Sequence, residues 1–173
     1  MVADALFFVA GMLAWTLVEY VIHGVLGHQR RTFVAGLHEV HHRDPRAVFA
    51  MRAWIPVAVV LIGGFLTFGV SPAMLVLIGL ATGFGIYELV HYRIHFAVPV
   101  CELEARLRAR HLAHHLREPD AIFGVTSRFW DVVLGTEPSP ARMRELAELG
   151  ARVAPLTGSS NLGSLLRSRN IAA

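Results

Sequence analysis

The stretch Arg110–Thr136, RHLAHHLREPDAIFGVTSRFWDVVLGT, decides how the rest of the chain is arranged. Its three histidines, His111, His114 and His115, fall at positions i, i+3 and i+4, which share one face of an α-helix. Three imidazole rings on one face can point into one small volume. The stretch therefore predicts a helix that presents a metal-binding face.

Three further histidine clusters precede this stretch. HEVHH repeats the H-x-x-H-H spacing, HYRIH places two histidines four residues apart, and HGVLGH places two five residues apart. The four clusters hold all ten histidines: His23, His28, His38, His41, His42, His91, His95, His111, His114 and His115. A single buried histidine is as readily a hydrogen-bonded core residue as a ligand. Ten in four short groups favour metal binding, because buried imidazoles need partners and those in membranes are costly and usually functional.

The composition indicates a membrane protein of one domain. The chain has 173 residues, of which 54% are hydrophobic, and its mean hydropathy of +0.50 is too high for an ordinary soluble domain. The single cysteine, Cys101, excludes an internal disulfide and a cysteine-rich metal site. The formal net charge is +3, and all 16 basic residues are arginine. Their arrangement does not favour nucleic-acid binding, so no nucleic-acid partner is expected.

Three apolar runs predict about three transmembrane helices, at residues 5–22, 53–70 and 73–90. Each is close to the length of about 20 residues that a helix needs to cross a bilayer. A cleaved signal peptide is the alternative for the first run, but no basic residue precedes it. Ser71 and Pro72 leave almost no loop between the second and third runs. These two runs should therefore form an antiparallel hairpin.

The arginines predict the orientation of this bundle. Residues 1–4 and the 71–72 turn contain no arginine, whereas arginines flank the histidine clusters. The positive-inside rule then places the clusters on the cytoplasmic side of the membrane, which is the inner membrane in a bacterium. We thus expect an all-α integral membrane bundle over residues 1–136, with the histidines in a cytosolic cap formed by residues 23–52 and 91–136.

The C-terminal part is predicted to be separate from this bundle. Ser139 and Pro140 predict the start of a short amphipathic helix that ends near Leu149. The residues that follow are rich in Gly, Ser, Asn and Arg, which predicts a flexible tail. Residues 137–173 are therefore expected to form an amphipathic helix and a tail.

Ten imidazoles suit two metal ions better than one. A structural zinc site is usually closed by four ligands and would leave about six histidines unused. Two ions would each take about five and keep one position open for oxygen or water. Imidazole binds Zn, Cu, Fe and Ni alike, so the ligand type does not identify the ion.

Three carboxylates near the clusters are candidates to support the ligand rings by hydrogen bonds: Glu19, Glu88 and Asp131. Glu19 precedes His23, and Glu88 precedes His91, by about one helical turn. For Glu19, a carboxylate in interfacial water is an equally favoured alternative. No catalytic residue beyond the metal ligands is predicted.

The order of these motifs resembles the fatty acid hydroxylase and sterol desaturase superfamily of integral-membrane di-iron enzymes. The resemblance covers Trp15–Thr136, through EYVIHGVLGH, HEVHH, YELVHYRIH and RHLAHH followed by FGVTSRFWDVVLGT. It implies that the ten histidines hold two iron ions, with zinc as an alternative occupant in an isolated sample. It also implies hydroxylation of a lipid or fatty acid by O2 and two external electrons. Because no fused cytochrome b5 domain is expected, the implied donor is a separate ferredoxin or a cytochrome b5-type protein with its reductase.

The histidine pattern does not choose the substrate. The FGVTSRFWDVVLGT ending resembles the fatty acid 2-hydroxylase and sterol-modifying branches, which favours an acyl lipid. Two departures stand out: three predicted spanning helices where members often have four, and Glu88 and Phe96 where relatives commonly show Asp and a further His. A carotenoid or sterol hydroxylase, and a non-catalytic membrane protein that stores or senses metal, are the alternative hypotheses.

Overall fold

The computed structural model describes residues 2–29, 32–48 and 54–155. Within these ranges it contains helices and no strands, which confirms the predicted all-α class. The helices are α1 (Val2–Tyr20), the π-helix η1 (Val21–Gln29), α2 (Phe33–Arg43), α3 (Trp54–Phe68), α4 (Pro72–Phe96), α5 (Glu102–Leu116), α6 (Phe129–Leu134) and α7 (Pro140–Ala151). The predicted flexible tail from residue 156 onward, and residues 30–31 and 49–53 of the predicted cap and second span, lie outside the described residues.

Two of the helical segments are long and apolar enough to cross a membrane, Val2–His28 and Pro72–Phe96. The run predicted at 53–70 forms the shorter apolar helix α3, which has 15 residues. It ends at Phe68 because Gly69 takes a left-handed conformation with φ of 58°. Apolar side chains on these helices remain exposed, such as Leu13 at 65% and Leu66 at 79%. Such exposure suits contact with lipid and not with water.

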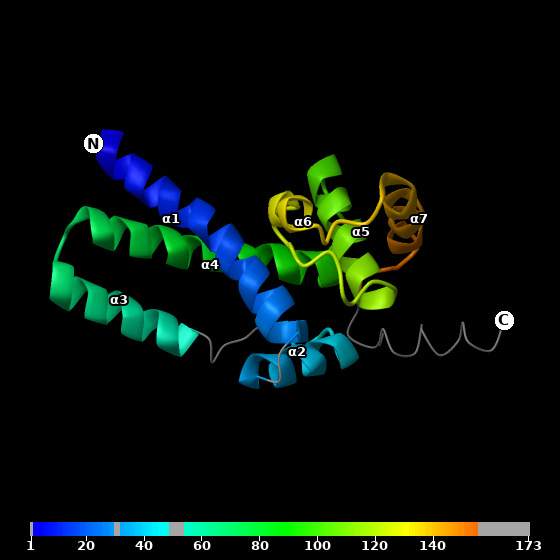
Figure 1. The fold of residues 1–173 in the computed structure, drawn as a ribbon, viewed down its shortest axis with the longest axis horizontal. Helices are drawn as coiled ribbons and strands as arrows, with labels where there is room; N and C mark the ends of the chain where they lie inside the picture. Colours follow the sequence, from blue (N-terminus) through cyan, green and yellow to red (C-terminus); the bar gives the residue numbers. More distant parts are fainter. Residues whose placement is uncertain (1, 30–31, 49–53, 156–173) are drawn as a thin grey trace.

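α3 and α4 form the predicted antiparallel hairpin, with its tip at the same end of the molecule as the start of α1 (Figure 1). Ser71 caps α4, because its hydroxyl accepts a hydrogen bond from the Met74 N–H at 3.4 Å, and Pro72 occupies the first turn. At the other end of the hairpin the Trp54 and Phe84 rings lie 4.7 Å apart, centroid to centroid.

α1 and α4 make the closest helix contact of the described chain, at two glycines. A Cβ atom built on Gly79 would lie 3.0 Å from the Gly11 Cα atom and 2.1 Å from the Phe8 carbonyl oxygen. One turn further along, Gly83 faces the Trp15 side chain. The absence of side chains at these positions lets the two backbones touch, as small residues do in membrane helix pairs.

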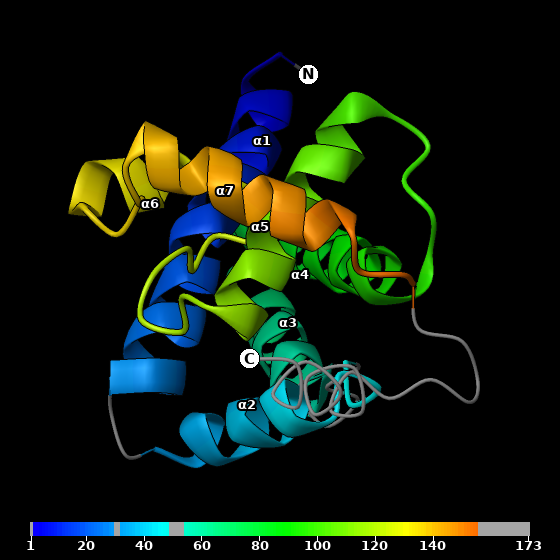
Figure 2. The same cartoon turned by 90° about the vertical axis from the view of Figure 1, so that its right-hand side faces the viewer.

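The cap lies at the end of α4 opposite the hairpin tip (Figure 1) and is built around α5. In Figure 2, which looks at this end, α7 crosses α5 and α2 lies on the other side of the bundle. Leu146 of α7 packs with Ala113 and Ile122 in a small apolar core in which each residue is at most 1% exposed. α6 ends at Leu134, where Gly135 takes a left-handed conformation with φ of 76°. Ser139 and Pro140 begin α7 as predicted, and the helix continues to Ala151.

Candidate metal centre

The structure brings all ten histidines together in two neighbouring groups of five. Within each group, one ring nitrogen from every histidine lies within 4.8 Å of the others. Group one consists of His23, His28, His38, His42 and His114. Group two consists of His41, His91, His95, His111 and His115. The groups touch, since the His42 and His115 rings stack with centroids 4.2 Å apart.

The π-helix η1 explains how the first histidine cluster serves group one. On an α-helix, residues five apart point in clearly different directions. A π-helix forms i→i+5 hydrogen bonds, so residue i+5 comes one turn after residue i. His23 and His28 both lie in η1 and therefore face the same way. Such wide turns are rare and frequently occur at functional sites.

The two HH pairs divide between the groups. On α2, His42 joins group one and its neighbour His41 joins group two. On α5, His114 joins group one and His115 joins group two. Adjacent residues on a helix point about 100° apart, so each pair can reach two centres that lie side by side. α2 and α5 thus hold the two groups next to each other.

The distances within group two fit a shared metal ion and do not fit hydrogen bonds alone. The His111 Nε2 atom lies 2.9 Å from that of His91, 3.0 Å from that of His95 and 3.0 Å from that of His115. A neutral imidazole nitrogen carries either one proton or one lone pair, so it cannot make three hydrogen bonds at once. Neighbouring nitrogens bound to one metal at about 2.0–2.1 Å lie about 3 Å apart.

Group one has the same spacing. The Nε2 atoms of His28 and His38 lie 2.7 Å apart, and those of His38 and His42 lie 2.8 Å apart. The His114 Nε2 atom is 3.1 Å from both the His42 and the His23 Nε2 atoms. Nitrogens at these separations fit a second metal ion.

Burial keeps the cap imidazoles in the neutral form that binds metal. Desolvation, together with repulsion from neighbouring imidazoles, lowers the pKa of His41 to about 3, that of His42 to about 4 and that of His114 to about 3. Near pH 7 these rings therefore have a free lone pair to donate.

Two backbone carbonyls fix the rings of group one. The Nδ1–H of His23 donates to the Phe123 carbonyl oxygen at 2.6 Å, and the Nδ1–H of His114 donates to the Ala121 carbonyl oxygen at 2.7 Å. A carbonyl only accepts, so the proton must sit on Nδ1 and the lone pair on Nε2. Sequence reasoning missed both carbonyls, because a backbone acceptor leaves no signature in the side-chain pattern.

Two of the predicted carboxylates, Glu19 and Asp131, contact the loop between α5 and α6 (residues 117–128) and not the histidine rings. Glu19 accepts hydrogen bonds from the Val125 N–H at 2.5 Å and the Thr126 N–H at 2.9 Å. It is only 3% exposed, so it is not the carboxylate in interfacial water that the sequence also allowed. Asp131 accepts from the Phe123 N–H at 2.8 Å.

The third predicted carboxylate lies nearer to group two. Glu88 accepts from the Trp54 indole N–H at 2.7 Å. It is buried on α4, about one turn before His91. Support of the metal ligands by Glu19, Glu88 and Asp131 stays a prediction.

The rings of group two are surrounded differently from the His23 and His114 rings of group one, whose Nδ1 atoms donate to backbone carbonyls. The Nδ1 atoms of three histidines of group two are buried without a hydrogen-bond partner among the described residues: His91, His111 and His115. On the membrane side the Tyr87 ring lies 5.3 Å from the His91 ring and 6.0 Å from the Trp15 ring, between centroids. Apolar rings therefore cover this side of group two.

These features define an all-α protein of the membrane type, with a site suited to a pair of metal ions at the end of its long helices. The family model for the fatty acid hydroxylases matches residues 8–136. The chain belongs to the fatty acid hydroxylase family.

Curated relatives carry names from lipid hydroxylation. Dihydroceramide fatty acyl 2-hydroxylase FAH2 of Arabidopsis thaliana is 35% identical over 74% of this chain and 59% of its own length. Ceramide very long chain fatty acid hydroxylase scs7 of Schizosaccharomyces pombe is 34% identical over 76% of this chain and 42% of its own length. Fatty acid 2-hydroxylase of Rattus norvegicus is 32% identical over 75% of this chain and 38% of its own length. The chain thus spans less than two thirds of these relatives.

A solved structure has the same fold. It is described as full-length scs7p with only the hydroxylase domain visible, and it matches with a TM-score of 0.62 and 28% identity. The match covers 89% of this chain and 59% of that chain.

Proposed function

We propose that this protein is a membrane di-iron monooxygenase that hydroxylates the acyl chain of a lipid or fatty acid, with O2 and two externally supplied electrons. The observation that carries the proposal is the convergence of ten imidazoles into two five-nitrogen groups. The names of the relatives add the substrate class, because they describe hydroxylation of fatty acyl chains. They favour an acyl lipid over a carotenoid and favour catalysis over metal storage.

Each group of five would hold one iron ion, and its histidines would leave one position open. A bound iron pair would supply the activation of O2 that attack on an unactivated C–H bond requires. Neutral imidazoles bring no negative charge, which distinguishes this site from the carboxylate-rich di-iron sites of soluble bundles. The chain itself supplies the fixed ring orientations, through the Phe123 and Ala121 carbonyls.

The position of the site supports access by a membrane lipid. His91 and His95 lie on the last turns of α4, a helix of membrane-spanning length. On the membrane side, Trp15, Phe84 and Tyr87 form an aromatic layer, with Trp15 and Phe84 centroids 5.1 Å apart. These rings would keep water from group two and offer an apolar surface to an acyl chain.

The sidedness and the electron donor belong to the same proposal. The arginine distribution supports a cytoplasmic position for both groups. Electrons would then come from a ferredoxin, or from a cytochrome b5-type protein with its reductase, on that side of the membrane.

Lipid profiling tests this function. Cells that express the protein are expected to contain a lipid heavier by one oxygen atom in its acyl chain, absent from cells that express His114→Ala. The His114 Nε2 atom lies 3.1 Å from two other nitrogens of group one, so its loss should disable that group. The exposed Cys101→Ser variant is the control and should keep the product.

Two outcomes would contradict the proposal. A lipid profile that the wild-type protein leaves unchanged, with readily exchanged metal and no O2 consumption, would identify a metal-storage or metal-sensing protein. A shift in pigments of a carotenoid-producing host, without any change in acyl lipids, would identify a carotenoid hydroxylase.

A further inference from the structure

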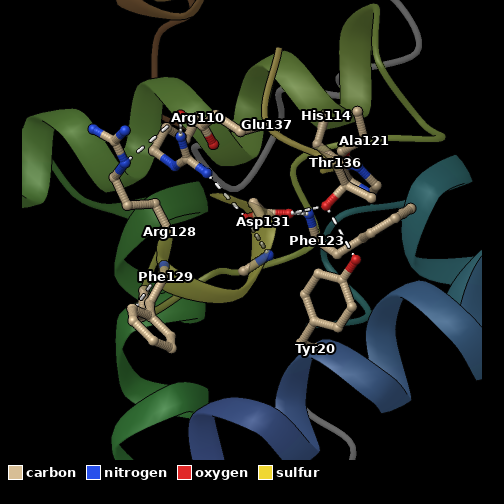
Figure 3. A network of polar contacts seen from close by, with 12 residues as sticks. Tyr20, Arg110, His114, Ala121, Phe123, Arg128, Phe129, Asp131, Thr136 and Glu137 are labelled. Atoms are coloured by element: carbon tan, nitrogen blue, oxygen red, sulfur yellow. Dashed lines mark hydrogen bonds and ion pairs between the residues drawn. The ribbon is translucent and has the colours of Figure 1, made fainter. Parts of the chain in front are cut away.

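A fully buried carboxylate holds the loop that follows α5. Asp131 is 0% exposed and accepts four hydrogen bonds (Figure 3). Two come from the backbone N–H groups of Phe123, at 2.8 Å, and Gly124, at 3.0 Å. The others come from the Thr136 hydroxyl at 2.8 Å and the Arg110 guanidinium at 3.0 Å. Its negative charge is therefore compensated, and its bonds tie the loop of residues 117–128 to α5 and to the segment that follows α6.

The bond from the Gly124 N–H links Asp131 to His23 through a single peptide group. The Phe123 carbonyl, which accepts the His23 Nδ1–H, and the Gly124 N–H, which donates to Asp131, belong to the same planar peptide unit. Asp131 therefore sets the plane of the carbonyl that orients His23. A Cβ on Gly124 would lie 1.9 Å from the Ser127 carbonyl oxygen, so only glycine fits here.

The other carbonyl of the loop is held in a similar way. The Ala121 carbonyl, which accepts from His114, shares its peptide unit with the Ile122 N–H, and this donates to the Thr136 carbonyl at 3.2 Å. Between the two carbonyls, Ile122 has a φ of 61°, a strained conformation for a β-branched residue. Such strain persists only where the surroundings enforce it, and it is frequent at functional sites.

The membrane helix α1 holds the same loop from the other side. Glu19 takes the N–H groups of Val125 and Thr126 and also the Thr126 hydroxyl. The neighbouring Tyr20 hydroxyl lies 3.1 Å from the Thr136 hydroxyl. The loop is therefore held by α1 on one side and by Asp131 and the rest of the cap on the other.

This support reaches one metal group only. His23 and His114 both belong to group one, whereas the Nδ1 atoms of His91, His111 and His115 in group two have no hydrogen-bond partner within the described residues. We propose that Asp131, held by Arg110, is a positioning residue for group one and does not act on group two. The proposal rests on the proposed metal pair and assigns the two groups unequal dependence on the loop.

Asp131→Asn tests this role. Asparagine has nearly the same shape, but in either orientation its NH2 group faces one of the two loop N–H groups, so at least one bond is lost. It also leaves the buried Arg110 without this carboxylate. Loss of such an outer partner typically lowers metal affinity by roughly 10–100-fold. We expect this loss at group one, and unchanged affinity at group two.

The measurement is a titration of the detergent-purified full chain with cobalt(II), followed by bound metal and by the visible absorption of the bound ion. At the lowest cobalt concentration that fills both groups of the wild type, Asp131→Asn should hold about one tightly bound ion per chain, where the wild type holds two. In a His95→Ala background, which impairs group two, Asp131→Asn should remove the remaining tight binding. In a His23→Ala background, which impairs group one, it should change little, because both substitutions act on the same ring.

Met74→Ala controls for a purely structural effect. Met74 is 9% exposed in the first turn of α4, at the end of that helix away from His91 and His95, and its truncation should lower the unfolding temperature without separating the two affinities. Equal weakening of both groups in Asp131→Asn, or wild-type affinity at both, would overturn the inference. A wild-type protein that binds two ions in this way but makes no hydroxylated lipid would overturn the proposed function alone.

Discussion

Replacement of His111 by alanine is expected to release the metal of group two and to abolish hydroxylated lipid. His111 is the central ring of that group, because its Nε2 atom lies within 3.0 Å of the Nε2 atoms of His91, His95 and His115. It is 1% exposed, so its truncation leaves a gap in the middle of a buried set of nitrogens. The product should fall by more than about 100-fold, beyond the effect of losing an outer partner. Metal analysis and mass spectrometry of the lipids measure both effects.

Arg106→Ala on the same helix is the matched control. The Arg106 side chain is 71% exposed and pairs with the similarly exposed Glu102, a contact worth little to stability. This variant should keep two ions and the wild-type amount of product. If His111→Ala behaved like Arg106→Ala, the assignment of group two as a metal site would be wrong.

Gly79→Ala is expected to force α1 away from α4 and to destabilise the whole protein. The new Cβ would lie 2.1 Å from the Phe8 carbonyl oxygen, and backbone atoms cannot move aside as the end of a flexible side chain can. Overpacking of this kind costs about 1–3 kcal/mol or more. Because α1 leads into η1 and α4 carries two histidines of group two, metal binding should weaken with it. Thermal unfolding in detergent measures the loss.

Gly63→Ala provides the same chemical change without the clash. No atom lies within 4 Å of a Cβ built on Gly63, which is in the helix α3. Alanine favours a helix over glycine by about 1 kcal/mol, so this variant should be as stable as the wild type or slightly more stable. Equal unfolding temperatures for the two alanine variants would show that the backbones of α1 and α4 do not meet at Gly79.

The helical class and the shared face of each H-x-x-H-H cluster could be predicted, because both follow from local spacing. Apolar runs of spanning length indicate membrane helices, and H-x-x-H-H places three rings on one face. The meeting of the four clusters is inferred from their concentration of histidine and from the family resemblance, and not from spacing. The division of each HH pair between the groups could not be predicted. It depends on where α2 and α5 stand relative to each other, and local periodicity does not fix that.

The support of the rings could be predicted only in part. The sequence offers two equal hypotheses for Glu19, a hydrogen bond to His23 one turn away or a place in interfacial water, but Glu19 binds the backbone of residues 125 and 126. That loop lies more than 100 residues further along the chain, so only the tertiary fold brings it to α1. The π-helix had one visible sign, the five-residue spacing of His23 and His28. Histidines five residues apart face the same side of a helix only if the helix widens to a π-helix.

A structure of the metal-loaded protein, with the ions located by anomalous scattering, tests the central claim most directly. We predict two ions, one inside each group of five histidines, with metal–nitrogen distances of about 2 Å. The histidines of α1–η1, α2, α4 and α5 would all contribute to that pair. A single ion, or ions bound away from these two groups, would contradict the account.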